Sequence, residues 1–330
     1  MSDLSFDTAF AAPLGQARAL DPSRRYDTLV LGAGPAGIAA AIYLVRKGAA
    51  TGVIAQTLGG QVAWTAAIEN YPGYRLIDGA ALVERFREQV AEFQPDLGLG
   101  LEVSAVSRHG ALFTVRAGGD EYAARSLVVA TGKRPRTLGV PGEQRLLGRG
   151  VAFCATCDAP LYRGKVVGVV GGGNSGSEAV LDLSRVAARV VLFQDLDHLT
   201  ADPVLARRVR TDARIEVLLG TAVIEVLGDE RVRGVRVREA AGGAARELPL
   251  DGIFVEIGLL PNTDPVRGVA PLNERGEIEV DCACRTAVPG LFAAGDVTSV
   301  PYKQIVVAAG EGAKAALSAC DYLLRLGAEG

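Results

Sequence analysis

Two glycine-rich turns constrain the fold of this chain more than any other feature. Each turn follows a short apolar run and precedes a helical pattern: residues 26–31 lead into the first at 32–37, and residues 165–170 lead into the second at 171–176. In a GxGxxG sequence placed in this way, the first glycine makes the tight turn, the second lets the backbone approach a pyrophosphate, and the third lets the helix pack on the strand. Amides at the helix start add the positive end of the helix dipole. The pattern predicts two dinucleotide sites.

The predicted fold class is therefore α/β, with two Rossmann-like (three-layer ββα) dinucleotide-binding domains. Further apolar strands end in small residues at 130–132 and 294–296, where a backbone must lie close to a ligand. They predict that the chain returns to the first domain after the second, so that the second domain is inserted in the first. The expected organisation is a flexible tail at 1–25, a first domain at 26–137 and 265–330, and a second domain at 138–264, with hinge crossings at Pro141-Gly142 and Pro261-Asn262.

A pair of cysteines indicates the chemistry. Cys154 and Cys157 form a CxxC motif followed by Asp158, about 14 residues before the second turn. A CxxC environment can lower the first thiol pKa to about 7, which makes a competent nucleophile. A zinc half-site is the alternative, but no second ligand pair stands at a suitable spacing, so no metal is predicted. A dithiol before a nucleotide turn suggests that electrons pass from a nucleotide into a disulfide.

The residues expected at the ribose positions carry no positive charge. An acidic residue about 20 residues after a fingerprint usually binds the ribose hydroxyls. Gln56 occupies this place after the first turn, and Gln194 with Asp195 after the second. Asp195 would repel a 2′-phosphate and can accept a 2′-hydroxyl. The second site is therefore predicted to prefer NADH to NADPH.

Bulk properties exclude several classes of protein. The formal net charge is −3, the sequence pI is about 5.6, and no basic tract suggests binding to nucleic acid. The longest apolar runs are far too short to span a bilayer. The first 25 residues carry Asp3 and Asp7 where a signal peptide would be basic, so a cytoplasmic location is expected.

The other thiols are interpreted as structural, and both histidines as surface residues. Cys282 and Cys284 form a CxC whose alternation along a strand would place both on one face, and Cys320 lies in an apolar helical run. His109 and His198 follow no motif that suggests a general base, so both are expected at the surface.

The motifs also occur in a specific order. Besides the two turns and the CxxC, they comprise Gly59-Gly60-Gln61, Ile68-Glu69-Asn70-Tyr71, Ala130-Thr131-Gly132, Ile257-Gly258-Leu259-Leu260-Pro261-Asn262-Thr263, Gly295-Asp296 and Pro301-Tyr302-Lys303-Gln304. Together they resemble the low-molecular-weight thioredoxin reductase family of flavoproteins. Within it they are most similar to the flavoprotein subunit of bacterial alkyl hydroperoxide reductase. The resemblance runs from about residue 26 to residue 326.

The resemblance implies that the first domain binds FAD and the second NADH. The residues expected to bind FAD are Gly32, Gly34, Pro35, Ala36, Gly37, Gln56, Gly60, Gln61, Asn70, Thr131, Gly132, Gly295, Asp296, Lys303, Gln304 and Ile305. Those expected to bind NADH are Gly171, Gly173, Asn174, Ser175, Gly176, Glu178, Gln194 and Asp195. By the family pattern, Cys157 exchanges electrons with the flavin, Cys154 attacks the disulfide of a partner, and Asp158 shuttles the proton. A homodimer is also implied.

The chain departs from the resemblance at two places. The peroxide-reductase flavoprotein carries an N-terminal tandem thioredoxin-like domain with its own dithiol, and 25 residues are too few to fold one. Gln56 also replaces an acid expected near the FAD adenosine. The first departure implies that electrons leave for a separate carrier protein.

The expected function is thus that of a flavin-dependent disulfide reductase. It would pass electrons from NADH through FAD and the dithiol to a thioredoxin- or glutaredoxin-like carrier that feeds a peroxiredoxin. The alternatives are an NADPH-dependent thioredoxin reductase, a hydrogen-peroxide-forming NADH oxidase, and a redox sensor without turnover. Asp195 argues against the first, and the intact CxxC-Asp argues against the last.

Overall fold

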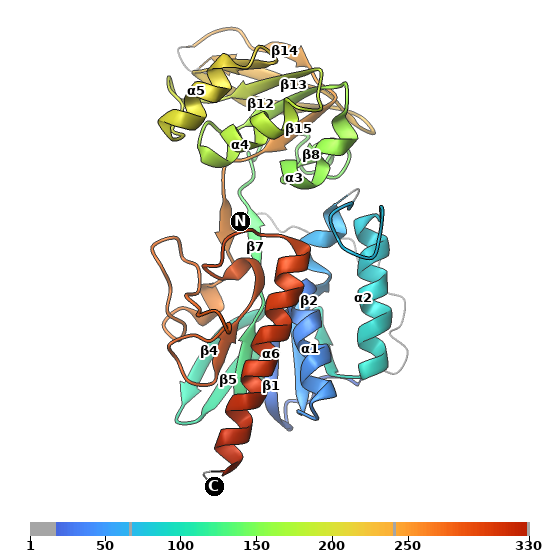
Figure 1. The fold of residues 1–330 in the computed structure, drawn as a ribbon, viewed down its shortest axis with the longest axis vertical. Helices are drawn as coiled ribbons and strands as arrows, with labels where there is room; N and C mark the ends of the chain where they lie inside the picture. Colours follow the sequence, from blue (N-terminus) through green and yellow to red (C-terminus); the bar gives the residue numbers. More distant parts are fainter. Residues whose placement is uncertain (1–17, 66–67, 240–241, 329–330) are drawn as a thin grey trace. The chain divides into compact units, whose positions relative to one another are not determined.

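The computed structural model describes residues 18–65, 68–239 and 242–328 (Figure 1). These residues divide into two compact units. The first unit contains the chain up to Gly60, then Glu84–Thr131, then the chain from Thr263 onward. The second contains Gln61–Val83 and Gly132–Asn262. The α/β fold with an inserted second unit, predicted from the sequence, is confirmed.

A seven-stranded sheet forms the centre of the first unit. Its order is β3-β2-β1-β6-β5-β4, and β17 pairs with β6. Pairing is parallel around β1 and β6 and antiparallel from β6 through β5 to β4. The strands are β1 (Arg25–Ala33), β2 (Thr51–Leu58), β3 (Asp96–Leu99), β4 (Val103–His109), β5 (Leu112–Ala117), β6 (Asp120–Val129) and β17 (Leu291–Ala293).

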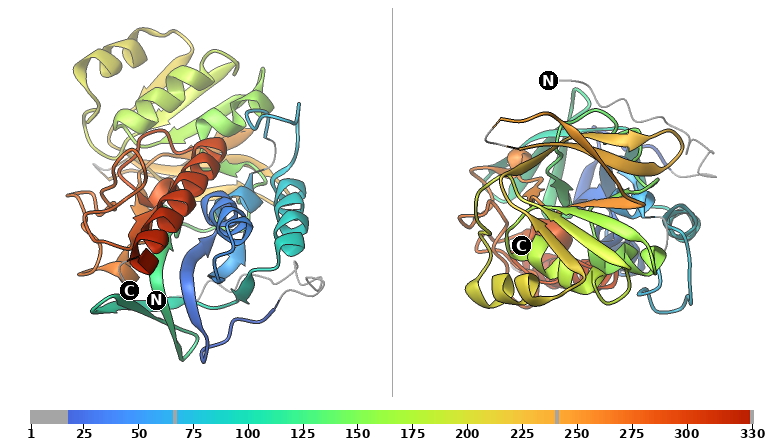
Figure 2. Two further views of the ribbon diagram at one scale, coloured as in Figure 1. Left: turned by 60° about the horizontal axis from the view of Figure 1, so that its bottom comes forward. Right: turned by 90° about the horizontal axis from the view of Figure 1, so that it is seen from above.

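The apolar run that precedes the first glycine turn becomes the central strand of this sheet. Leu29, Val30 and Leu31 in β1 are fully buried, as expected for a parallel strand covered on both faces. Helices α1 (Pro35–Arg46) and α6 (Ile305–Ala328) pack side by side in this unit (Figures 1 and 2). Two short 3₁₀ turns, η3 (Asp264–Val266) and η4 (Gly295–Val297), belong to the returning chain.

The second unit has three layers. A parallel sheet of order β11-β10-β9-β15-β8 lies between helices and the antiparallel sheet β12-β13-β14. The strands are β8 (Val151–Ala152), β9 (Val166–Val170), β10 (Arg189–Phe193), β11 (Ile215–Leu218), β12 (Thr221–Gly228), β13 (Val232–Glu239), β14 (Arg246–Pro249) and β15 (Gly252–Val255). The helical segments are α3 (Ala155–Asp158), η2 (Ala159–Tyr162), α4 (Asn174–Leu183) and α5 (Pro203–Thr211).

Strand alternation explains the layering. Val167 and Val169 of β9 pack in the core that contains α4, whereas Val166 and Val170 pack in the core on the β12–β14 side. Successive side chains of a strand point to opposite faces, so one apolar strand serves both cores. This is the three-layer ββα arrangement that the sequence predicted.

A two-stranded ribbon lies at two of the points where the chain passes between the units, after Thr131 and after Asn262. It pairs β7 (Lys133–Pro135) with β16 (Leu259–Pro261) in antiparallel fashion. The predicted crossing at Pro261-Asn262 falls at the end of this ribbon. The predicted crossing at Pro141-Gly142 lies instead inside the second unit, because the Val226 amide donates to the Pro141 carbonyl at 2.9 Å. Two helical segments, η1 (Gly60–Trp64) and α2 (Gly79–Phe93), contain residues of both units.

Part of the expected flexible tail is ordered. Residues 1–17 lie outside the described residues, but Arg18 and Leu20 hydrogen-bond to the backbone of Leu97 in β3. Arg24 donates to the buried carboxylate of Asp96 at 2.7 Å. The prediction of a tail at 1–25 is therefore wrong for residues 18–25, because these contacts add the segment to the sheet edge. None of the described helices is both long and apolar enough to cross a membrane.

Candidate active site

The first glycine turn joins β1 to α1 and is shaped by steric exclusion. Gly32 has φ +107°, and a Cβ there would lie 2.3 Å from the Ala130 carbonyl oxygen and 3.1 Å from the Thr131 nitrogen. A Cβ on Gly37 would lie 1.9 Å from the Gly32 carbonyl oxygen. A Cβ on Gly34 would meet nothing within 4 Å. The protein's own packing therefore requires the outer two glycines, while the middle one faces open space of the kind a pyrophosphate needs.

The second glycine turn repeats this geometry in the second unit. Gly171 has φ +121°, and a Cβ there would lie 2.4 Å from the Glu256 carbonyl oxygen. A Cβ on Gly176 would lie 1.8 Å from the Gly171 carbonyl oxygen. A Cβ on Gly173 would meet only the Thr200 hydroxyl, at 3.7 Å. Each turn therefore fits a dinucleotide, and in each the helix begins at a glycine that has no side chain to cap the first amides.

Several residues expected to bind FAD gather at the first turn. A Cβ on Gly60 would lie 3.6 Å from Gly34 Cα, and a Cβ on Gly295 would lie 3.0 Å from the Ala36 side chain. Three segments distant in the sequence thus meet where β1 ends. Pro35 and Ala36 open α1, and Asp296 follows Gly295 in η4.

A buried carboxylate that the sequence motifs did not indicate lies beside this cluster. Glu311 on α6 is 4% exposed, and its Oε2 accepts a hydrogen bond from the Gly295 amide at 2.8 Å. Burial raises the pKa of Glu311. The signal available in the sequence was an acidic residue between small and apolar residues in the first half of a helical run. Its position fixes the backbone that presents Asp296.

The remaining residues expected near FAD are distributed over both units. Gln56 is exposed within β2, the Lys303 ammonium donates to the Thr298 carbonyl at 2.7 Å, and Ile305 begins α6 directly after Gln304. Gln61, Asn70 and Gly132 belong to the second unit.

At the second turn, the two residues after β10 have different environments. Gln194 is buried; its Oε1 accepts from the Gly172 amide at 3.0 Å and its Nε2 donates to the His198 carbonyl at 3.3 Å. Its side chain thus holds the turn in shape, which sequence reasoning did not foresee. Asp195, by contrast, is exposed.

Asn174 at the start of α4 is also used within the protein. Its Nδ2 donates to the Asp202 carboxylate at 2.9 Å, and the Asp202 amide donates to its Oδ1 at 2.8 Å. These two bonds tie the segment before α5 to the second turn. Ser175 and Glu178 remain exposed on the first turns of α4.

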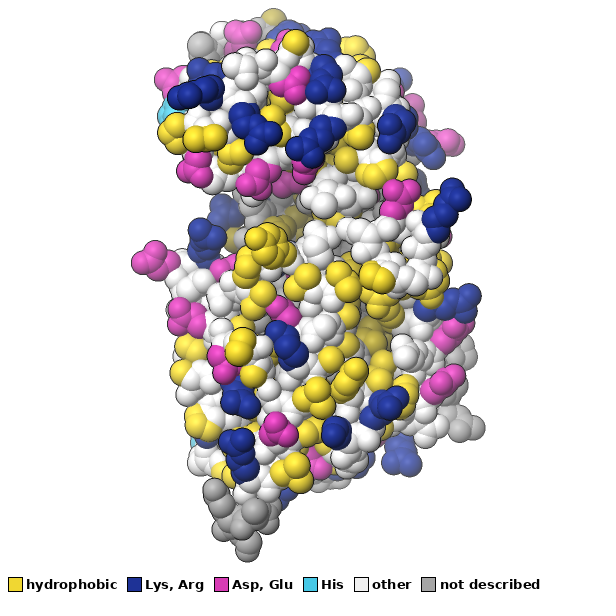
Figure 3. Space-filling view, in the orientation of Figure 1, with side chains coloured by type: hydrophobic (Ala, Val, Ile, Leu, Met, Phe, Trp, Pro, Cys, Tyr) yellow, Lys and Arg dark blue, Asp and Glu magenta, His cyan; other side chains and the backbone are white. Residues whose placement is uncertain are grey.

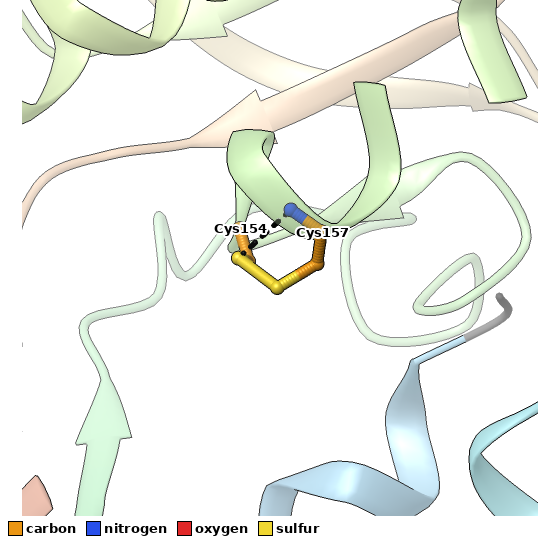
Figure 4. Close-up of a disulfide and its surroundings, with 2 residues drawn as sticks. All are labelled: Cys154 and Cys157. Atoms are coloured by element: carbon orange, nitrogen blue, oxygen red, sulfur yellow. Dashed lines mark hydrogen bonds between the residues drawn. A yellow bond between two sulfur atoms is a disulfide. The ribbon is translucent and has the colours of Figure 1, made fainter. Parts of the chain in front are cut away.

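The dithiol lies in the same unit, at the end of β8. Cys154 and Cys157 are joined as a disulfide (Figure 4), and both side chains are half-buried. Cys154 caps α3: its sulfur accepts from the Cys157 amide at 3.2 Å, and its carbonyl accepts from the Asp158 amide at 3.1 Å. An amide aimed at the Cys154 sulfur would stabilise negative charge on it after reduction.

Asp158 directly follows Cys157 at the end of α3. It is buried, and its Oδ1 has no hydrogen-bond partner within the described part of the chain. Burial raises the pKa of Asp158 to about 6. Burial likewise raises the pKa of Tyr162 to about 12, with the charge of Asp158 as the second cause. A carboxyl with a pKa near neutrality beside a dithiol is suited to exchange a proton with a thiol.

The remaining cysteines do not form a second dithiol of this kind. Cys282 and Cys284 lie in a turn, one exposed and one buried, so the expectation that strand alternation places them on one face is wrong. His109 and His198 are both exposed. Among residues 18–65, 68–239 and 242–328, no group of three or more His, Cys, Asp or Glu side chains is placed to hold a metal ion.

A family model described as pyridine nucleotide-disulphide oxidoreductase matches residues 26–312. The chain belongs to this family. Membership confirms the predicted class of enzyme, and it implies FAD and a nicotinamide nucleotide as cofactors. The two glycine turns fit both groups.

Named relatives and solved structures agree with this assignment. The chain is 48% identical over 318 residues to the F subunit of alkyl hydroperoxide reductase from Pseudomonas putida, covering 95% of this chain and 61% of the relative. It is 43% identical to the Escherichia coli K12 protein of the same name, with 94% and 60% coverage. The chain therefore spans about three-fifths of the length of these curated relatives. Thioredoxin reductase from Streptococcus pyogenes superposes with a TM-score of 0.87 at 34% identity, over 91% of this chain and 99% of that one. The predicted resemblance is confirmed.

The open space at Gly34 gives a first prediction. Gly34→Ala should fold normally, because its φ of −74° suits any residue and a Cβ meets no atom, but it should reduce FAD retention about 10-fold or more because the methyl fills the pyrophosphate space. Bound flavin per chain, measured by absorbance, tests this. Gly310→Ala is the matched control, since a Cβ there also meets nothing, and it should retain FAD. Full FAD occupancy in Gly34→Ala would place the pyrophosphate elsewhere.

The environment of Asp158 gives a second prediction, which concerns the pH dependence of stability. Because its pKa is raised from 3.8 to about 6, the folded state binds this proton more tightly than the unfolded chain does. The resulting stabilisation is complete below pH 4 and is lost as the pH rises through 6. Asp158→Asn should therefore exceed the wild type in unfolding free energy by about 2 kcal/mol at pH 8, and the gap should close toward pH 4. Urea unfolding at both pH values measures it, with the exposed Asp229→Asn as control. A gap that does not change with pH would contradict the assignment.

Proposed function

We propose that this chain is a flavin-dependent disulfide reductase that passes electrons from NADH through FAD and the Cys154–Cys157 couple to a separate thioredoxin- or glutaredoxin-like carrier. The carrier would in turn reduce a peroxiredoxin. The observation that supports this best is the placement of the disulfide and the second glycine turn in one sheet. Strands β8 and β9 lead into them, and both run parallel to β15, which lies between them.

In this proposal, Cys154, Cys157 and Asp158 each have a separate chemical role. When bound, FAD supplies the two-electron chemistry that links a nicotinamide to a disulfide. Reduction of the Cys154–Cys157 bond takes two electrons and two protons and yields two thiols. Cys154 then attacks the disulfide of the carrier, and Cys157 resolves the mixed disulfide by displacing the carrier's thiol. Asp158 accepts and returns the proton that activates the attacking sulfur.

The charge beside the second turn supports NADH as the electron donor. Asp195 and Asp197 are both exposed after β10. Either carboxylate would repel the 2′-phosphate of NADPH, and Asp195 can accept the 2′-hydroxyl of NADH. This charge disfavours the alternative of an NADPH-dependent thioredoxin reductase, although the fold matches that family.

The proposed partners follow from the relatives and from one surface. The curated relatives carry the name alkyl hydroperoxide reductase, which supports a peroxiredoxin as the final acceptor. Apolar side chains gather over α1 and α6 in the first unit (Figure 3), where Tyr43, Val306, Leu317 and Leu324 are exposed. An apolar face of this kind supports a homodimer.

The nucleotide preference is testable directly. The value of kcat/KM should be at least about 10-fold higher for NADH than for NADPH. Repulsion between a nearby carboxylate and the 2′-phosphate of NADPH costs about 1.4 kcal/mol or more, and this energy corresponds to a factor of 10. Asp195→Asn should narrow the ratio by restoring part of the activity with NADPH. Equal or better use of NADPH by the wild type would overturn the preference and favour the thioredoxin reductase alternative.

An anaerobic titration with NADH tests the whole electron path. The wild type should take up about four electrons per chain, two on FAD and two on the disulfide. Cys157→Ser should take up about two, and Cys320→Ser, a substitution of a cysteine in α6, should keep about four. Uptake of about two by the wild type would leave the dithiol out of the path and make the NADH oxidase the better description.

A further inference from the structure

One residue lies between the dithiol and the nucleotide turn. In the second unit, β15 pairs with β9 on one side and with β8 on the other, all in parallel. The register pairs Val255 with Val170 and Phe254 with Ala152. If this register continues past the end of β15, Glu256 lies beside Gly171 on one side and beside Cys154 on the other. Carboxyl ends of parallel strands meet at one edge, which is where such sheets bind ligands.

Glu256 contacts both neighbours. Its amide donates to the Val170 carbonyl at 2.8 Å, and its own carbonyl oxygen occupies the space beside Gly171. Its carboxylate accepts a hydrogen bond from the backbone amide of Ala155, the residue that follows Cys154. The main chain of Glu256 therefore supports the glycine turn, and its side chain holds the start of α3.

The Glu256 carboxyl lies in a partly buried environment that disfavours its charged form. Glu256 is half-buried; burial raises its pKa to about 7, the Ala155 hydrogen bond opposes that rise, and Glu178 on α4 adds to it. Asp158, the last residue of α3, is a second carboxyl near the dithiol. At alkaline pH the Glu256 carboxylate is therefore ionised beside the amide of Ala155, the residue next to the cysteine whose sulfur becomes a thiolate on reduction. Two negative charges at this range repel each other in a partly buried site.

We propose that Glu256 is a positioning residue that ties the dithiol to the nucleotide turn, and that its negative charge opposes the thiolate form and so makes the Cys154–Cys157 couple more strongly reducing. This inference rests on the proposed function, because it assumes that the disulfide cycles. A strongly reducing couple passes its electrons onward to a carrier disulfide.

The test uses exchange with a small dithiol. Dithiothreitol reduces the protein disulfide: the Cys154–Cys157 bond breaks, the ring disulfide of dithiothreitol forms, and two hydrogen atoms move to the protein sulfurs. If one protein thiol ionises, its proton goes to solvent. Holoenzyme is equilibrated in reduced and oxidised dithiothreitol mixtures, quenched with an alkylating agent and digested. The tryptic peptide 150–163 carries Cys154 and Cys157 and no other cysteine, so its alkylation reports this couple alone.

Glu256→Gln keeps a hydrogen-bond acceptor for Ala155 and removes the charge. At pH 8 it should shift the exchange constant toward the reduced form by about 10-fold, equivalent to about 30 mV. At pH 6 the two proteins should agree, because Glu256 and the thiols are then mostly protonated. An equal shift at both pH values, or none at pH 8, would overturn the charge effect.

Glu256→Ala removes the acceptor as well. Hydrogen exchange in peptide 150–163 should then quicken about 10-fold at the Ala155 amide, while Glu256→Gln should restore most of the protection. Equal protection in Glu256→Ala and the wild type would overturn the positioning role.

Asp251→Asn is the matched control. Asp251 precedes β15 at its other end, and its carboxylate accepts from the Val166 amide at 2.8 Å. This variant should leave the dithiol equilibrium unchanged at both pH values. A shift as large as that of Glu256→Gln would contradict a specific role of Glu256, because loss of sheet stability would then explain both shifts. If the wild-type disulfide itself resists dithiothreitol, the proposed function fails. If it cycles and Glu256→Gln titrates like the wild type, only the inference about Glu256 fails.

Discussion

The close contact between a strand end and the helix that follows it is the constraint on which both units depend. At each glycine turn the third glycine lies so near the carbonyl of the first that a methyl group would stand within 2 Å of an oxygen, at 1.9 Å for Gly37 and 1.8 Å for Gly176. This contact lets α1 and α4 begin directly at the sheet edge. Their first amides, which no side chain of the N-cap glycine can satisfy, then point into the space beside Gly34 and Gly173. The shape of each nucleotide site thus follows from backbone packing, before any side chain contributes.

This locality explains why the sequence predicted the fold and the outline of the site. The requirement for glycine at 32 and 37 depends on residues within one turn, and the CxxC depends on three residues of spacing. Contacts between distant segments were not predictable in the same way. Glu311 supports Gly295 from α6, Glu256 reaches Ala155 across about 100 residues, and Arg24 reaches Asp96 across 72. Each depends on strand order, which a single sequence does not specify. Gly142 shows the converse: its Pro-Gly signal suggested a crossing, but the neighbouring backbone is bonded within the second unit.

The buried carboxylates share one energetic feature. Asp158, Glu256 and Glu311 all have pKa values raised, chiefly by burial, so each is held where its charged form is disfavoured. Glu256 and Glu311 recover part of this cost through a backbone amide, whereas Asp158 Oδ1 has no partner among the described residues. The least compensated of the three is the one beside the dithiol. Its pKa of about 6 lies close to neutrality, so this carboxyl can both accept and return a proton, as the proposed chemistry requires.

The dithiol itself has little backbone support. Strand β8 contributes two residues and α3 four, so the regular structure around Cys154 is short. Isolated helical segments of this length are not stable in water, and their position must come from tertiary contacts. The strand beside β8 is β15, and the first amide of α3 is held by the residue that directly follows β15. Two such contacts hold the start of α3: Ala155 packs in the core that contains α4, and its amide donates a hydrogen bond to Glu256. A site built in this way brings an ionisable group close to the dithiol, because the side chain that binds the Ala155 amide is the one that carries the charge.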